Sequence, residues 1–153
     1  MRKFFEGLYL IVLTLWVGGL WAIGYLAAPV LFSALESRQM AGLVAGKLFG
    51  LIGWFGLGSA TFLLLFLVQR WGGQVFKRGV FWLVLLMSLM TMASLFGIQP
   101  IMAQLKSDAL PREVMESVFR DRFATWHGIS SILYLMQSML GLWVVVWVNR
   151  GLK

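Results

Sequence analysis

The sequence contains no cysteine and a single histidine, His127, among its 153 residues. Without a thiol the protein can form no disulfide bond, no thiolate nucleophile and no cysteine-bound metal or iron–sulfur centre. A single histidine also excludes a haem held by two histidines and a metal site built from several histidines of one chain. We therefore expect no cofactor and no metal site.

Motifs of the common enzyme classes are also absent. The sequence has no GxxxxGK[ST] phosphate loop, no HExxH zinc motif and no GxSxG nucleophile motif. No pair of carboxylates lies within an apolar run, since every acidic residue falls outside these runs. An acid–base dyad in the middle of a membrane is therefore not expected. We expect no catalytic residues and a protein that is not an enzyme.

Charged residues are scarce, at 12% of the chain, whereas 60% of the residues are hydrophobic. A soluble domain ordinarily has about a quarter charged residues, so this composition indicates a membrane protein. The charge-free runs cover 7–35, 48–69, 79–105 and 123–149. Each run exceeds the roughly 20 residues that a helix needs to cross a bilayer. Open sheets cannot satisfy their backbone in lipid, and the alternating pattern of barrel strands is absent.

The sequence therefore predicts an all-α integral membrane four-helix bundle, a single transmembrane domain over 1–153. The predicted spans are 8–32, 48–69, 79–104 and 126–148. The first run is too long for the roughly 7–15-residue core of a signal peptide, so we expect an uncleaved first helix.

Basic residues predict the orientation of the bundle. Lys and Arg are dense in the short N-terminal, C-terminal and central segments, where Glu6 is the single acid. By the positive-inside rule both termini lie in the cytoplasm, and we expect a multi-pass protein of the bacterial inner membrane. The net charge of +7 is explained by anionic lipid rather than by nucleic acid. The expected partners are the lipid bilayer and either further copies of the chain or another membrane protein.

Small residues mark the helix faces expected to pack closely. Along the second span they recur at helical spacing within one arc, the small-xxx-small pattern that lets two helices approach. The predicted packing positions are Gly42, Gly46, Gly50 and Gly53 in the second span and Gly18 in the first.

Polar side chains of the last span gather on one face, opposite Ile132, Met136, Trp143 and Trp147. In lipid such a face turns towards other helices or a hydrated space. With polar or aromatic groups of the other spans it forms a candidate ligand-binding set of His127, Ser131, Tyr134, Gln137, Gln99, Trp21 and Tyr25. For His127 three roles stay open: orienting the helix entry, binding a ligand or proton, and ligating a metal in an oligomer.

Helix boundaries follow from prolines and caps. Pro29 predicts a kink or an end between Tyr25 and Phe32, because proline lacks the N–H of a helical hydrogen bond. Ser33 with Glu36 fits a capping box and predicts a helix start there. Pro111 is expected to begin a short amphipathic helix before the last span.

The stretches TLWVGGLWAIGYLAAPVLFSAL, AGLVAGKLFG and FATWHGISSIL, in this order, carry a resemblance. The chain resembles the bacterial members of the domain-of-unknown-function family grouped with human transmembrane protein 205. The resemblance spans essentially the whole chain and implies a four-helix integral membrane protein without an established biochemical activity. Members of that family often have an asparagine where this chain has Tyr134.

Three functional hypotheses follow. The first is a protein that binds or passes a small solute or lipid, or assists a membrane complex, through its inward polar face. The second is a membrane redox or metal-handling subunit that uses His127 and the methionines of the third span, since thioethers suit copper(I). The third is a structural subunit whose glycine face docks a partner helix.

Overall fold

The computed structural model describes residues 2–110 and 112–151, and this part of the chain forms four long helical rods. Span 1 runs through α1 (Arg2–Trp21), a π-helix (Ala22–Ala27) and α2 (Ala28–Ala34). Span 2 is α3 (Arg38–Trp71), followed by a 3-10 helix (Gly72–Lys77). Span 3 joins α4 (Gly79–Met92), a second π-helix (Ala93–Ile98) and α5 (Gln99–Ala109). Span 4 is α6 (Arg120–Gly151).

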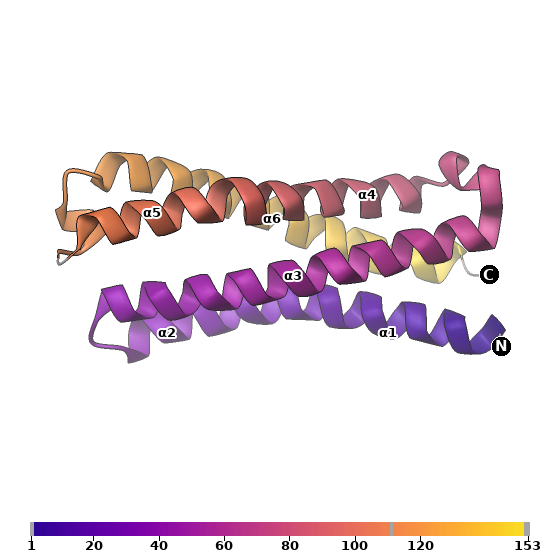
Figure 1. The fold of residues 1–153 in the computed structure, drawn as a ribbon. Coiled ribbons are helices and arrows are strands. Elements are labelled where there is room, and N and C mark those ends of the chain that lie inside the picture. The colour runs from indigo at the N-terminus through magenta and orange to yellow at the C-terminus, as the bar shows by residue number, and fades with distance from the viewer. Residues whose placement is uncertain (1, 111, 152–153) are drawn as a thin grey trace.

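All four rods are long and apolar enough to cross a membrane, which confirms the predicted all-α bundle. The protein is therefore a multi-pass membrane protein. Before α6 the predicted amphipathic helix is reduced to one 3-10 turn, Val114–Glu116. Pro111, expected to begin that helix, lies outside the described residues. The two ends of the chain lie at the same end of the bundle (Figure 1), which we call the terminal end; the other is the loop end.

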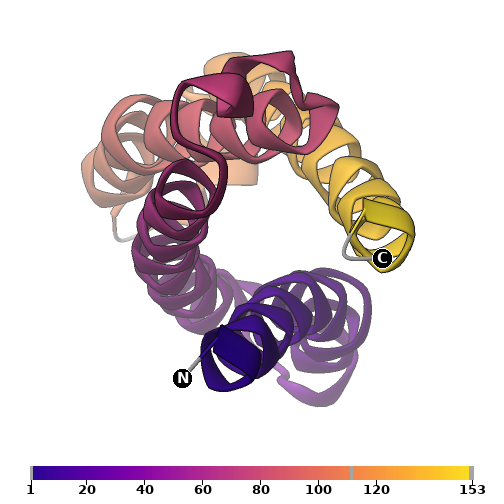
Figure 2. The same cartoon turned by 90° about the vertical axis from the view of Figure 1, so that its right-hand side faces the viewer.

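The rods form a ring in which α1 packs on α3, α3 on α4, α4 on α6 and α6 on α1 (Figure 2). Its core is built around Trp16, Leu63, Met87 and Val144, which are completely shielded from the surroundings. By contrast, no described residue of 21–40 or 112–136 is buried. At the loop end spans 2 and 3 remain packed, since Ala41 and Leu105 are buried, whereas the parts of spans 1 and 4 at this end are loosely packed.

Each π-helix comes just before a proline, Pro29 in span 1 and Pro100 in span 3. Proline has no N–H, so the carbonyl four residues earlier loses its helical partner. A wide π turn absorbs this mismatch without ending the helix. The interruption predicted near Pro29 thus takes the form of a π-helix, and the helix continues to Ala34.

The predicted capping box at Ser33 and Glu36 is wrong. Ser33 lies inside α2, where its hydroxyl donates to the carbonyl of Val30. The side chain of Ser37 caps α3 instead, since its Oγ accepts from the backbone N–H of Met40 at 3.2 Å. The chain turns between Leu35 and Ser37, later than the sequence pattern indicates.

The glycine face of α3 contacts span 3. A Cβ built on Gly42 or Gly46 would lie 3.7 or 3.8 Å from the ammonium of Lys106, and one on Gly53 would lie 2.7 Å from Leu95. A Cβ on Gly50 would lie 3.5 Å from Oε1 of Gln99. Gly53 therefore lets span 3 approach α3 closely, whereas a Cβ at the other three positions would make ordinary van der Waals contact with span 3.

The predicted packing role of Gly18 is wrong within this chain. Gly18 is exposed, and a Cβ at this position would meet nothing within 4 Å. The inward stripe of α1 lies on another face and consists of Tyr9, Leu13, Trp16, Val17 and Leu20.

Candidate functional site

Tyr134 of α6 reaches into the π-helix of span 1. Its hydroxyl donates to the backbone carbonyl of Leu20 at 2.6 Å and lies beside the backbone N–H of Gly24. In an uninterrupted α-helix this carbonyl and this N–H would bond each other. The tyrosine hydroxyl therefore occupies the gap in the backbone ladder. Tyr134 joins span 4 to span 1.

Gln137 lies one turn further along α6 and is buried with Thr91 of α4. Its Nε2 donates to the Thr91 hydroxyl at 2.7 Å, and this hydroxyl donates to the carbonyl of Met87 at 2.8 Å. The indole N–H of Trp21 donates to the carbonyl of Ser138 at 3.4 Å. Three of the predicted ligand-binding side chains, Trp21, Tyr134 and Gln137, thus use their polar atoms to connect helices of this chain.

We expect Gln137→Leu to destabilise the bundle by removing this interhelical hydrogen bond. In a double-mutant cycle with Thr91→Val, the coupling free energy should be of order 0.6 kcal/mol and at most about 2 kcal/mol, as for other membrane hydrogen bonds. Unfolding in mild detergent titrated with sodium dodecyl sulfate measures it. Strictly additive effects of the two substitutions would contradict the assigned bond.

At the loop end, the ammonium of Lys106 turns into the bundle. It donates to the carbonyl of Gly42 at 3.0 Å and lies 5.7 Å from the ring centre of Phe123. The side chain is half-buried. The predicted third span ends at 104, so sequence reasoning left this lysine outside the membrane helices and missed it. The available signal was its position seven residues, or about two helical turns, after Gln99, which places both on one face of span 3.

His127 and Ser131 lie on the first half of α6 and are both exposed. The imidazole stacks on Phe123 with ring centres 5.8 Å apart and planes inclined by 10°. The hydroxyl of Ser131 donates to the carbonyl of His127 on the same helix, at 2.8 Å. Through Phe123, the structure places His127 near Lys106, a neighbour that the sequence did not predict.

Aromatic rings continue this cluster towards the middle of the bundle. The ring of Tyr25, 38% exposed, lies 4.7 Å from Trp21 and 6.3 Å from Tyr134. Phe49 of α3 meets Tyr134 edge to face at 5.1 Å, from the opposite side of the ring of helices. The seven predicted side chains thus do not form one compact site. They extend from buried interhelical bonds at Gln137 to exposed groups at His127.

One side of the loop end has little helix packing. α2 packs on α3, whereas α6 packs on α1, α4 and α5, and α2 and the start of α6 lie at opposite edges of the bundle (Figure 1). We call the side between α2 and residues 120–136 of α6 the lateral opening. His127 and Ser131 belong to this segment of α6 and are exposed, and Phe123 of the same segment lies 5.7 Å from the ammonium of Lys106.

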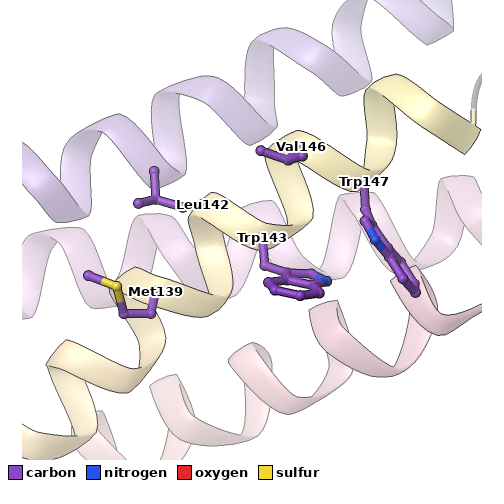
Figure 3. A pocket seen from close by; sticks show the side chains of 5 residues that line it. All are labelled: Met139, Leu142, Trp143, Val146 and Trp147. Atoms are coloured by element: carbon purple, nitrogen blue, oxygen red, sulfur yellow. The ribbon is translucent and has the colours of Figure 1, made fainter.

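A separate hollow of about 480 Å³ lies on the outer surface of α6 (Figure 3). Its lining is apolar and consists of Met139, Leu142, Trp143, Val146 and Trp147. None of the predicted ligand-binding residues belongs to it. In a bilayer such an outward apolar surface contacts acyl chains, so the hollow needs no specific ligand.

At the terminal end, two arginine side chains contact an acidic residue and an aromatic ring. Arg70 of α3 forms an ion pair of 2.9 Å with Glu6 of α1, and Arg70 and Arg78 both lie over the ring of Trp71. The ion pair ties span 1 to span 2, and the tryptophan and arginines suit a membrane interface. No ion pair of this kind involves Lys106 among the described residues.

The fold and these contacts define a multi-pass four-helix membrane protein with interhelical hydrogen bonds in its middle and loosely packed parts of spans 1 and 4 at its loop end. Residues 11–111 match the family model described as Domain of unknown function (DUF4149), and the chain belongs to this family. The matched region ends before α6, so it includes Gln99 and Lys106 but not His127 or Tyr134. No curated protein and no solved structure matches the chain.

Proposed function

We propose that this protein is not an enzyme and that it binds a membrane lipid at the lateral opening. The observation that carries the proposal is the low burial of spans 1 and 4 at the loop end. No described residue of 21–40 or 112–136 is buried, although the ammonium of Lys106 in span 3 lies 5.7 Å from the Phe123 ring of span 4, on which His127 stacks. A lipid is the ligand that such a side can receive directly from the bilayer. Lys106, Gln99 and His127 offer polar contacts, and aromatic rings offer apolar ones.

The cellular setting belongs to the same proposal. We assign the protein to the bacterial inner membrane with both termini in the cytoplasm. The density of Lys and Arg in the short segments of the terminal end supports this orientation. The resemblance to the family grouped with human transmembrane protein 205 agrees with a four-helix membrane protein, and no activity is carried over from it.

The two other hypotheses have less support. Of the span 3 methionines, Met87 and Met90 are buried whereas Met92 is 42% exposed. The three therefore do not line one face of their helix that could form a metal site with His127. The glycine face of α3 is occupied by Lys106, Gln99 and Leu95 of the same chain. This face is therefore partly filled within the chain, which leaves less room for a helix of another subunit.

Photo-crosslinking from neighbouring positions of α6 tests lipid binding. Ser131 lies at the lateral opening, whereas Ile132, 62% exposed, belongs to the opposite, lipid-facing side of the helix. A photoreactive phenylalanine derivative is placed at either position, and the protein is washed with increasing detergent before illumination. We expect the lipid adduct at 131 to persist and the adduct at 132 to disappear, because only the first position lies beside a bound lipid.

Mass spectrometry of the intact protein measures both adducts. The wild-type melting profile and a monodisperse elution of each variant establish that the bundle is folded. Loss of both adducts at the same detergent concentration would show that the lateral opening holds no lipid beyond the surrounding bilayer, and would overturn the proposal.

A further inference from the structure

We infer that the lipid at the lateral opening carries an anionic phosphate headgroup and that the ammonium of Lys106 binds this phosphate. The inference rests on the proposed lipid binding and adds the charge of the ligand. It starts from the direction of the Lys106 side chain. A lysine near the end of a span ordinarily extends to the aqueous interface. Lys106 lies in the last turn of α5 yet points towards α3 and contacts Gly42.

The local geometry leaves this ammonium able to bind a further group. An ammonium has three N–H donors. One donates to the carbonyl of Gly42, and the ring of Phe123 faces the charge at 5.7 Å without accepting a full hydrogen bond. Gly42 and Gly46 have no side chains to fill the adjacent space, and their Cβ positions lie 3.7 and 3.8 Å from Nζ. A phosphate oxygen is a strong acceptor for the remaining donors.

Charge balance points to an anion rather than to a zwitterion. In the described part of the chain, the ion pair at the terminal end joins Arg70 to Glu6, and no carboxylate pairs with Lys106. A half-buried cation at membrane depth is costly without a counterion. A phosphatidylglycerol-type headgroup supplies one negative charge and no positive charge. A choline headgroup would bring a second cation next to Lys106, and no acidic side chain pairs with that lysine to balance it.

The depth of Lys106 in the membrane identifies a lipid as the source of the phosphate. Lys106 lies three residues before the end of α5 at Ala109, close to where the hydrocarbon core gives way to headgroups. The ring of Phe123 provides apolar surface next to it, suited to the glycerol and upper acyl region of the same molecule. A free phosphate ion would not cover this apolar surface.

The test compares two lysines at the same end of the bundle. Lys106→Gln removes the charge but keeps an N–H donor for the Gly42 carbonyl, and Lys106→Arg keeps the charge. Lys47→Gln is the matched control, because Lys47 is exposed on α3 next to Gly46 and has the same charge. Each purified protein is exchanged into nanodiscs of equal parts dioleoylphosphatidylglycerol and dioleoylphosphatidylcholine, released into the gas phase, and weighed with its retained lipids by native mass spectrometry.

We expect wild type, Lys106→Arg and Lys47→Gln to retain phosphatidylglycerol over phosphatidylcholine by about tenfold, and Lys106→Gln to lose this preference. Retained lipid without a headgroup preference in wild type would leave lipid binding intact and overturn the anionic assignment. Absence of any retained lipid in folded wild type would overturn both. A parallel titration with inorganic phosphate in detergent identifies the source: saturable quenching of tryptophan fluorescence without lipid retention would replace the lipid by a free anion.

Discussion

Gly56→Leu is expected to destabilise the bundle by about 1–3 kcal/mol or to prevent its assembly, because a buried indole occupies the space that the new side chain requires. The side chain of Trp16 is completely buried, and its Nε1 is the atom nearest to an ideal Cβ at Gly56, with Cε2 and Cδ1 at 3.1 and 3.2 Å. The contact joins the middles of α1 and α3. An indole held on all sides cannot move aside without opening the core.

Gly58→Leu is the matched control for this prediction. Gly58 lies on the same helix two residues later, is exposed, and a Cβ there meets nothing within 4 Å. Both substitutions bring the same gain in helix propensity, up to about 1 kcal/mol. Unfolding with sodium dodecyl sulfate and the oligomeric state in size-exclusion chromatography compare the variants. Equal stability of the two would show that Trp16 does not pack against Gly56.

Gly24→Ala is expected to separate span 4 from span 1 at the π-helix. A Cβ at Gly24 would overlap the ring of Tyr134, with Cζ at 3.0 Å and the hydroxyl oxygen at 3.1 Å. Tyr134 would have to withdraw, and its bond to the carbonyl of Leu20 would be lost. Overpacking of about 1–3 kcal/mol is then added to the loss of an interhelical hydrogen bond of about 0.6 kcal/mol.

The second π-helix supplies the control for this position. Gly97 also lies in a six-residue π-helix before a proline, but a Cβ there meets nothing within 4 Å. Gly97→Ala should therefore be neutral or stabilising by up to about 1 kcal/mol. In a Tyr134→Ala background, Gly24→Ala should become equally harmless, as measured by unfolding in detergent. A persistent cost in that background would assign the effect to the backbone of the π-helix rather than to Tyr134.

Helical periodicity predicted the buried polar positions in the second half of the last span, but not the exposure of His127 and Ser131 in its first half. Gln137 and Ser138 are buried, whereas Ile132, Met136 and Trp143 are exposed, as the 100° turn per residue requires. Polar and apolar side chains occupy different faces of this helix, so its sequence distinguishes an inward from an outward face. The sequence did not show which residues these polar groups would contact. Thr91 is 46 positions from Gln137, and only the packing of α4 on α6 brings them together.

Helical periodicity does not identify the inward face of span 1. Its residues are apolar on every side, and Leu13 or Val17 is as compatible with lipid as with another helix. In a bilayer, hydrophobicity does not separate these environments, because lipid chains are as apolar as the core. The stripe containing Gly18 was therefore chosen from small-residue spacing alone. The shape of Trp16 against Gly56 selects another face.

By itself the sequence determined that this protein has four membrane-spanning helices and an interruption near Pro29, since hydropathy, run length and proline chemistry act locally. Only the tertiary structure decided that Tyr134 enters the π-helix of span 1, that the core lies towards the terminal end, and that Lys106 turns inwards to Gly42. These features depend on which side chains of distant segments fit together in space. Such complementarity is a property of the packed bundle and not of any one helix.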